Sequence, residues 1–272
     1  MHSTYAQASL NWSIYMKSSR QKEIIRLLEQ EKVVSTMNLA EQFEVSVETI
    51  RRDLDQLEKQ GFLNKIYGGA ELRSNGAEPW PSLAIRTDSF QEDKSSIALA
   101  AMQYVPDHCT IALDAGSTVG EFCRHLSSRK NMTIICSDIH NAALVLASGG
   151  NRVYMMGGFL TTDGTSSGTY AKEFCSSLGE LDLFVCSTDG ASPEDGLTTN
   201  EMGINELKRR YMKKAKTTIL LADHSKFKQK GFYKMCDFSE VDILITDSMT
   251  PADTVEAIRN SGCQVVITTH SL

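Results

Sequence analysis

Residues 46–60 are the part of this 272-residue chain that most restricts how it can fold. Read as a helix, the segment gathers an apolar stripe at steps of three and four residues: Val47, Ile50, Leu54 and Leu57. The opposite side is polar and carries Thr49, Arg51, Arg52 and Asp55, with Ser46 at the N-cap position. The segment therefore predicts one helix with two distinct faces.

The flanking segments predict a helix–turn–helix followed by a wing. A helical pattern at 36–43 and a tight break at Glu44–Val45 precede the two-faced helix, and residues 61–69 read as a small β-hairpin. A first helix at 20–31 directs four side chains toward a core: Ile24, Ile25, Leu27 and Leu28. This order of elements lays a helix into the DNA major groove. We therefore expect a DNA-binding module over residues 16–73.

The charge of this module constrains how it binds. Residues 16–73 contain ten Lys and Arg against ten Asp and Glu, so the net charge of −6 belongs to the rest of the chain. With so few cations, useful affinity needs a dimer or larger homo-oligomer. Arg51 and Arg52 can each contact base or phosphate, or one can pair with Asp55 or Glu48, and helix periodicity leaves the choice open. The candidate DNA-binding residues are Ser46, Thr49, Arg51, Arg52, Lys65 and Tyr67.

Composition favours a soluble, cytoplasmic protein of two domains. Hydrophobic residues make up 41% and charged residues 23% of the chain, and no apolar run approaches the roughly 20 residues that span a membrane. Residues 1–15 lack a signal-peptide pattern and read as a disordered or misassigned extension. The seven cysteines form no CxxC pair and are expected to be small buried hydrophobes, so neither a disulfide framework nor a metal site or cofactor is predicted.

After a Gly- and Pro-bearing linker at 74–91, a different rhythm fills residues 92–272. Short apolar strands alternate with amphipathic helical stretches, which predicts an open, mostly parallel α/β sheet with helices on both faces. The predicted strands are 110–113, 133–136, 153–156, 181–187, 217–221, 243–246 and 265–268. Residues 92–272 are therefore expected to form a sensor and oligomerisation domain.

Polar and glycine residues follow nearly every predicted strand. They occur at Asp114–Thr118, Ser137–Asp138, Gly157–Gly158, Asp189–Gly190, Asp223–Ser225 and Asp247–Ser248. Asp and Gly often simply terminate strands, which explains any single end. Because ligands of open parallel sheets bind at the carboxyl ends of the strands, the whole set favours a small polar-ligand pocket.

Three motifs at these ends carry candidate chemistry. In 114–118, Gly116, Ser117 and Thr118 precede a helix and favour an anion at its N-terminus, although such loops also serve as plain caps. The loop 189–199 offers Asp189, Thr198 and Thr199, with Lys208 on the next helix, for sugar hydroxyls or proton transfer, or else is a long solvated loop. In 223–227, Lys226 can close on an anion, while no spacing among the histidines supports His224 as a metal ligand.

The chain resembles the DeoR family of bacterial transcription regulators. The resemblance rests on segments 20–25, 45–54 and 67–70, and on 113–118, 156–158, 188–190, 196–199 and 222–227 in the same order. It implies a winged helix–turn–helix joined to a sensor domain similar to ribose-5-phosphate isomerase. It also implies a repressor of carbohydrate or polyol catabolism that is released from its double-stranded DNA operator by a phosphorylated sugar.

Motif matching to this family assigns roles within the pocket. The residues that would cradle the effector's phosphate are Asp114, Gly116, Ser117 and Thr118, and those around its carbon chain are Asp189, Lys208 and Lys226. Strand ends and the polar loop add Ser137, Gly157, Gly158, Gly190, Thr198 and Thr199 to the candidate effector-binding set.

Two other functions stay open at this point. The second domain can instead be a sugar-phosphate isomerase or transferase that uses Asp189 with a nearby Lys or Glu. Against it stand the DNA module and Ile204, at a place where many family members carry Glu. A third reading is a plain oligomerisation domain with an empty pocket, which predicts no response to any sugar phosphate.

Overall fold

The computed structural model describes residues 19–31, 33–59, 62–72, 86–87, 89–126, 128–161 and 163–269. The chain divides into two compact units, Met1–Ser89 and Phe90–Leu272. The predicted extension at 1–15 lies outside the described residues, and so does most of the predicted linker at 74–91. Gln91, the last residue of that linker, already opens the first helix of the second unit.

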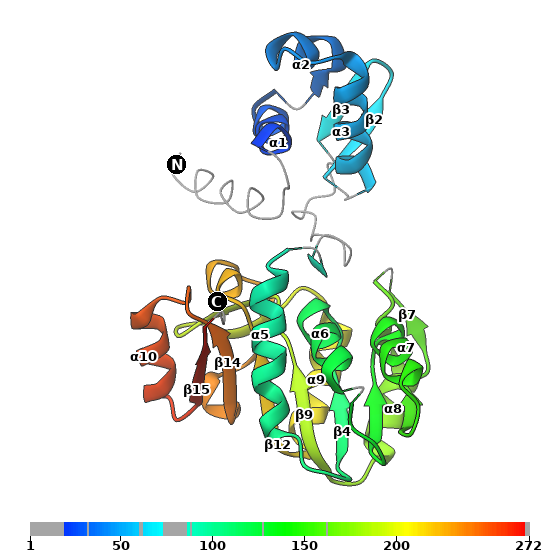
Figure 1. The fold of residues 1–272 in the computed structure, drawn as a ribbon, viewed down its shortest axis with the longest axis vertical. Helices are drawn as coiled ribbons and strands as arrows, with labels where there is room; N and C mark the ends of the chain where they lie inside the picture. Colours follow the sequence, from blue (N-terminus) through cyan, green and yellow to red (C-terminus); the bar gives the residue numbers. More distant parts are fainter. Residues whose placement is uncertain are drawn as a thin grey trace. The chain divides into compact units, whose positions relative to one another are not determined.

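The first unit is the predicted winged helix–turn–helix (Figure 1). Its elements are α1 (Ser19–Glu31), β1 (Val33–Ser35), α2 (Thr36–Gln42), α3 (Val47–Lys59), β2 (Leu63–Ile66) and β3 (Gly69–Leu72). The strands pair antiparallel in the order β1-β3-β2, so the hairpin β2–β3 forms the wing. Glu44, in the tight break before α3, adopts a left-handed backbone with φ of 52°.

The apolar sides of α1 and α3 meet in one core. Ile50, Leu54 and Leu57 are at most 1% exposed, and the four predicted side chains of α1 are also buried. Val47, in contrast, is 37% exposed, so its placement on the buried stripe was wrong. Val47 lies in the first turn of α3, where the helix has not yet reached the core.

A polar clasp joins α1 to α3 beside this core. Asp53 is 7% exposed and accepts hydrogen bonds from Arg20 Nε at 2.5 Å and from Gln21 Nε2 at 3.2 Å. Gln21 Nε2 also donates to Gln56 Oε1 at 2.7 Å. Because these partners satisfy the buried carboxylate of Asp53, the clasp fixes the position of α3 against α1.

Gly69 permits the close approach of β1 to β3. A Cβ at this position would lie 2.0 Å from the carbonyl oxygen of Val34. We expect Gly69→Ala to destabilise the first unit by about 3 kcal/mol, because the clash is with backbone and no rotamer relieves it. Gly68→Ala is the control: its Cβ meets nothing within 4 Å, and its φ of +78° costs only about 1 kcal/mol. Urea unfolding, followed by amide hydrogen exchange in the first unit, measures the free energy of unfolding of both variants. Equal losses of stability in the two variants would contradict this explanation.

The second unit is built on a seven-stranded sheet in which every neighbouring pair is parallel. Its strands are β4 (Thr110–Leu113), β5 (Thr133–Cys136), β6 (Arg152–Met155), β9 (Leu181–Cys186), β12 (Ala215–Leu221), β14 (Ile243–Asp247) and β15 (Gln264–Thr268). The order across the sheet is β15-β14-β12-β9-β4-β5-β6. All seven strands predicted from apolar runs are therefore confirmed, with ends that differ by at most two residues.

Helices cover both faces of this sheet (Figure 1). One face packs against α5 (Gln91–Ala101), α6 (Ser117–Leu126) and α7 (Ile139–Ala147). The other packs against α8 (Thr169–Ser177), α9 (Met202–Met212) and α10 (Ala252–Asn260). Strand residues alternate between the two cores: Ile111 and Leu113 join the first and Ala112 the second. The three-layer α/β/α architecture follows from this alternation.

The strand order reverses direction in the middle of the sheet. From β4 the chain moves outward through β5 to β6, and then returns to β9 on the other side of β4. In open parallel sheets, the crevice at such a switch point, beyond the carboxyl ends of the strands, is where ligands bind. The neighbouring ends of β4 and β9 are thus the first place to look for a site.

Two small antiparallel sheets were not predicted. One has the order β10-β11-β13 and consists of β10 (Gly190–Ser192), β11 (Gly196–Thr199) and β13 (Tyr233–Cys236). The other pairs β7 (Phe159–Leu160) with β8 (Ser166–Ser167). Short 3-10 turns complete the unit at Met102–Tyr104, His224–Lys228 and Phe238–Glu240.

The seven cysteines are all buried and none is paired, as the sequence predicted. Burial raises the pKa of Cys109 and of Cys263 to about 11, so both thiols stay protonated near neutral pH. Within the described part of the chain, no helix has the length and apolarity needed to cross a membrane.

Candidate functional site

The exposed side of α3 carries the candidate DNA contacts. Arg51 and Arg52 are both exposed. Arg51 pairs with Glu48 at 3.7 Å, whereas Arg52 makes no ion pair with any described residue. Asp55 pairs with neither arginine, because its carboxylate pairs with Lys65. Of the two arginines, Arg52 is therefore the one whose guanidinium no neighbouring acid engages.

The N-terminus of α3 is capped as predicted. Ser46 Oγ accepts a hydrogen bond from Thr49 N at 3.1 Å and lies 2.8 Å from Thr49 Oγ1. Both hydroxyls thus help to start the helix, and Ser46 remains exposed. Any DNA contact they make is added to a structural role.

Of the two predicted residues in the wing, one is exposed to solvent and the other is bonded to α3. Tyr67 is fully exposed in the turn between β2 and β3. Lys65 forms an ion pair with Asp55 of α3, and its backbone N donates to Glu58 Oε1 at 2.7 Å. The ion pair raises the pKa of Lys65 and lowers that of Asp55. Lys65 therefore fastens the wing to α3, and Tyr67 is the residue that the wing offers to a partner.

A buried polar cluster occupies the switch point between β4 and β9. Asp114, directly after β4, accepts from Lys208 Nζ at 2.7 Å and from Ser187 N at 3.0 Å. Lys208 Nζ also donates to the carbonyl oxygen of Ser187, the residue after β9, at 2.9 Å. The side chains of Asp114 and Lys208 are only 3% and 7% exposed. The structure thus brings together two predicted site residues, and it adds Ser187, which the sequence analysis did not name.

The charge of Lys208 is held in place by acidic neighbours. Burial alone would lower the pKa of Lys208, but the carboxylates of Asp114 and Asp189 outweigh that effect and raise it. Lys208 is therefore a permanent cation within the switch-point cluster. A buried cation fixed in this way is suited to an anionic group or to the hydroxyls of a bound molecule.

The loop that follows Asp114 opens α6. Gly116 has φ of +105°, a conformation that favours glycine, and Ser117 and Thr118 are the first two residues of the helix. The first backbone N–H groups of a helix have no partner within it and attract anions. Thr118 is 3% exposed, so its side chain faces the interior, whereas Ser117 remains partly accessible.

The loop 189–199 is largely ordered by its own hydrogen bonds. Asp189 Oδ2 accepts from Asn200 N at 2.7 Å, and Thr198 Oγ1 donates to Gly190 O at 3.0 Å while accepting from Gly231 N at 2.7 Å. Thr199 differs: its hydroxyl is buried and has no hydrogen-bond partner among the described residues. Thr198 therefore shapes the β10–β11 hairpin, and Thr199 keeps its hydrogen-bonding capacity.

A second group of predicted residues follows β5 and β6. Ser137 Oγ lies 3.5 Å from Tyr211 Oη, and Gly158, with φ of +120°, comes so close to the carbonyl oxygen of Ser167 that a Cβ would clash. A Cβ on Gly157 would meet nothing within 4 Å. These residues belong to the same sheet edge as Asp114.

Asp138 is a buried carboxylate that the sequence analysis named only as a strand end. Its Oδ1 caps α7 by accepting from Asn141 N at 2.8 Å, while Oδ2 has no hydrogen-bond partner among the described residues. Burial raises the pKa of Asp138, and the charge of Asp114 adds to the effect. An uncompensated buried oxygen beside Asp114 is a group that a bound hydroxyl can satisfy.

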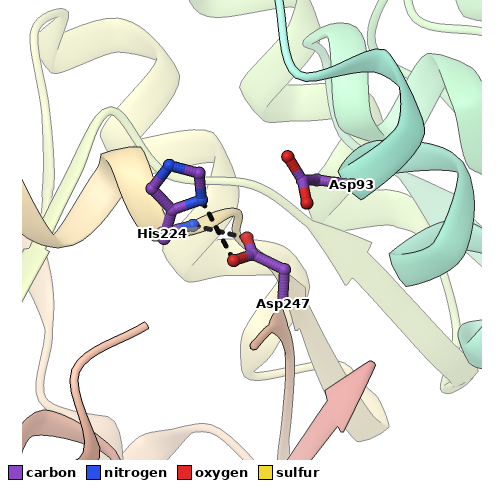
Figure 2. Close-up of side chains that lie close together, drawn as sticks. All are labelled: Asp93, His224 and Asp247. Carbon is purple, nitrogen blue, oxygen red and sulfur yellow. Dashed lines mark hydrogen bonds and ion pairs between the residues drawn. The ribbon is translucent and has the colours of Figure 1, made fainter. Parts of the chain in front are cut away.

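The predicted Lys226 lies in a separate part of the edge, in the turn after β12. It is 8% exposed. His224, two residues earlier in the same turn, bonds to Asp247 at the end of β14 through Nδ1 at 3.0 Å and through its backbone N at 2.7 Å (Figure 2). The hydrogen bond to Asp247 raises the pKa of His224, against the opposing effect of burial. Asp223 accepts from Ser225 N at 3.0 Å and orders the same turn.

Asn205 has a structural role at the contact between α9 and β13. It stands beside Ile204, and its Nδ2 donates to the carbonyl oxygens of Lys234 at 3.0 Å and Tyr233 at 3.4 Å. Asn205 thus fastens α9 to β13 and thereby holds Lys208, one turn further along α9, in position.

Comparison with known proteins identifies the family. Residues 20–75 match the DeoR-like helix-turn-helix domain, and residues 89–248 match the DeoR C terminal sensor domain. The chain therefore belongs to the DeoR family and is a DNA-binding transcriptional regulator.

Individual relatives cover almost the whole chain. The glycerol-3-phosphate regulon repressor of Escherichia coli is 28% identical over 92% of this chain and 98% of its own length. The HTH-type transcriptional regulator GolR of Listeria innocua is 30% identical over 91% of this chain and 97% of its own. Among solved structures, ribose-5-phosphate isomerase from Methanocaldococcus jannaschii is 19% identical, with a TM-score of 0.39 over 51% of this chain and 55% of its own.

Proposed function

We propose that this regulator represses a carbohydrate or polyol catabolic operon and is released from its operator by a phosphorylated sugar or polyol. The observation that carries the proposal is the switch-point cluster, in which Asp114, Ser187 and Lys208 meet at the ends of β4 and β9. The sheet topology makes this crevice the expected ligand site, and Lys208 is a fixed cation beside the N-terminus of α6.

The roles within the site follow from position. Gly116 and Ser117 would present backbone N–H groups to the phosphate of the effector at the start of α6. Lys208 and Asp189 would contact its hydroxyls. Thr199 Oγ1 and Asp138 Oδ2, which have no hydrogen-bond partner among the described residues, would be bonded by hydroxyls of the effector. We assign Thr198 a structural role in the β10–β11 hairpin rather than a contact with the effector.

The names of relatives support the chemical class. One relative is named a glycerol-3-phosphate regulon repressor, and that name joins repression to a phosphorylated polyol. We extend only the class to this chain, as a small phosphorylated sugar or polyol, and propose that the regulator acts as a homo-oligomer in the cytoplasm.

Thermal shift of the full-length protein tests the effector. The panel holds triose, pentose and hexose phosphates, polyol phosphates and their unphosphorylated counterparts. We expect one phosphorylated compound to raise the melting temperature in proportion to the logarithm of its concentration above Kd, and its unphosphorylated counterpart to have no effect. If none of the compounds changes the melting temperature, the second unit is instead an oligomerisation domain with an empty pocket. Conversion of any compound during incubation would instead support an enzyme.

A further inference from the structure

Three side chains outside the switch-point cluster converge from three separate elements (Figure 2). Asp93 comes from the first turn of α5, His224 from the turn after β12 and Asp247 from the end of β14. One ligating atom from each lies within 4.8 Å of the other two. Asp93 is 9% and Asp247 1% exposed, and His224 is partly buried.

We propose that Asp93, His224 and Asp247 bind a divalent first-row transition-metal ion, of which Zn²⁺ and Mn²⁺ are the test cases. One imidazole nitrogen with two carboxylate oxygens is a donor set that such ions accept, whereas Mg²⁺ prefers oxygen ligands and water. The sequence analysis predicted no metal site, because no histidine spacing supported one. Asp93 and Asp247 lie far from His224 in the sequence, so local spacing could not reveal the set.

The distances already approach those of a coordination sphere. Two ligands that each lie about 2.1 Å from one ion are separated by about 3.0 Å at a right angle and about 3.4 Å at the tetrahedral angle. His224 Nδ1 and Asp247 Oδ1 lie 3.0 Å apart. An ion between them would replace the hydrogen bond that now joins these atoms. The Asp93 carboxylate then has to close the remaining gap by a change of rotamer.

The surroundings of the three residues supply both access and support. A cavity of about 480 Å³ lies beside Asp93 and is lined by Phe90, Gln91, Glu92, Asp93, Ser95 and Glu121. Asp93 therefore has a route to solvent. The Phe90 ring packs edge-on against the imidazole of His224 at 4.9 Å, which fixes the plane of that ring. The backbone N of Met249 donates to Asp247 Oδ1 at 2.8 Å and orients the carboxylate.

A bound ion would tie α5 to the ends of β12 and β14. The turn that carries His224 also carries Lys226, a member of the candidate effector set. The metal would thus hold that turn in place from the side opposite the switch-point cluster, as a structural support for the sensor that is independent of which effector binds.

The test uses the full-length protein, freed of metal with a chelator and then titrated with Zn²⁺, Mn²⁺ or Mg²⁺. We expect one equivalent of Zn²⁺ or Mn²⁺ to bind and to raise the melting temperature, and Mg²⁺ to bind at least about tenfold more weakly. Asp93→Asn and His224→Asn should each weaken binding at least about 100-fold, since even the loss of an outer-shell partner costs 10–100-fold. Glu92→Gln is the matched control, because Glu92 lines the same cavity and is not a proposed ligand.

Co²⁺ provides a direct spectroscopic readout. Its visible absorption should change in the wild type and in Glu92→Gln, without a thiolate charge-transfer band, and stay that of the free ion in His224→Asn. Asp93→Asn leaves the His224–Asp247 hydrogen bond intact, so equal melting temperatures of this variant and the wild type in chelator establish that it folds. Absence of Zn²⁺ and Mn²⁺ binding by the wild type, or binding that both ligand variants retain, would overturn the proposal.

Discussion

Lys208→Met is expected to destabilise the second unit by about 3–5 kcal/mol, since it leaves the carboxylate of Asp114 buried without its cation. Asp114 would keep only its hydrogen bonds from Ser187 N and Oγ, at 3.0 Å and 3.3 Å. Urea unfolding of the second unit measures the loss. The same variant should lose the thermal shift with the effector, because Lys208 belongs to the proposed pocket.

Two further variants test whether the loss of stability comes from breaking the buried ion pair or simply from removing a lysine charge. Lys172→Met removes a lysine that pairs with Glu206 on the surface of the same unit, so it should cost at most about 1 kcal/mol. Asp114→Asn combined with Lys208→Met removes both charges and should recover part of the stability lost by Lys208→Met alone. If the double variant recovers none of the stability lost by Lys208→Met, the two side chains do not act as a pair.

Arg51→Ala combined with Arg52→Ala is expected to abolish specific operator binding while the first unit stays folded. Both side chains are exposed, and the pair between Arg51 and Glu48 at 3.7 Å contributes little to stability. Of the single variants, Arg52→Ala should have the larger effect. Loss of a bidentate base contact costs about 1–3 kcal/mol of discrimination, whereas loss of a phosphate contact weakens all sequences alike and lowers the salt slope.

Arg26→Ala is the matched control for these arginines. Arg26 is exposed on α1 and paired with Glu23, so its loss removes the same charge away from α3. Fluorescence anisotropy against specific and scrambled DNA at several salt concentrations measures all the variants. Specific binding retained by the double arginine variant would mean that α3 is not the recognition helix.

The parts of the fold that follow local patterns could be predicted from the sequence. The central strands of the parallel sheet are buried on both faces and read as apolar runs. Helix α3 is indicated by its apolar period and by Ser46 at its cap. The first turn of α3 shows the limit of periodicity. Val47 fits the stripe by spacing, yet it lies in the first turn of α3, before the helix reaches the core, and its side chain is exposed.

The small antiparallel sheets could not be predicted because their strands are only two to four residues long, too short to show a period. Gly196–Thr199 pairs on one side with Gly190–Ser192 and on the other with Tyr233–Cys236, a partner far along the chain. The pairing of Asp114 with Lys208 likewise joins two residues that lie far apart in the sequence. Both residues were assigned to the effector set through the family resemblance, but only the meeting of β4, β9 and α9 in space makes them a buried pair.

Residues whose function depends on a missing partner were the hardest to find. Asp138 stands out only once its Oδ2 is seen to be buried without a hydrogen bond among the described residues. Asp53 is a different case, because its carboxylate is buried but accepts hydrogen bonds from Arg20 and Gln21 of α1. Neither residue belongs to a local motif that indicates its role.

Fluorescence anisotropy of the full-length protein on DNA from upstream of its own gene, with and without the sugar and polyol phosphate panel, measures whether an effector controls operator binding. We expect specific binding that one phosphorylated compound weakens by about 100-fold, equivalent to about 2.7 kcal/mol of coupling between the pocket and the DNA-binding module. Unphosphorylated counterparts should leave the affinity unchanged. Specific binding that no phosphorylated compound weakens would contradict the proposed release mechanism.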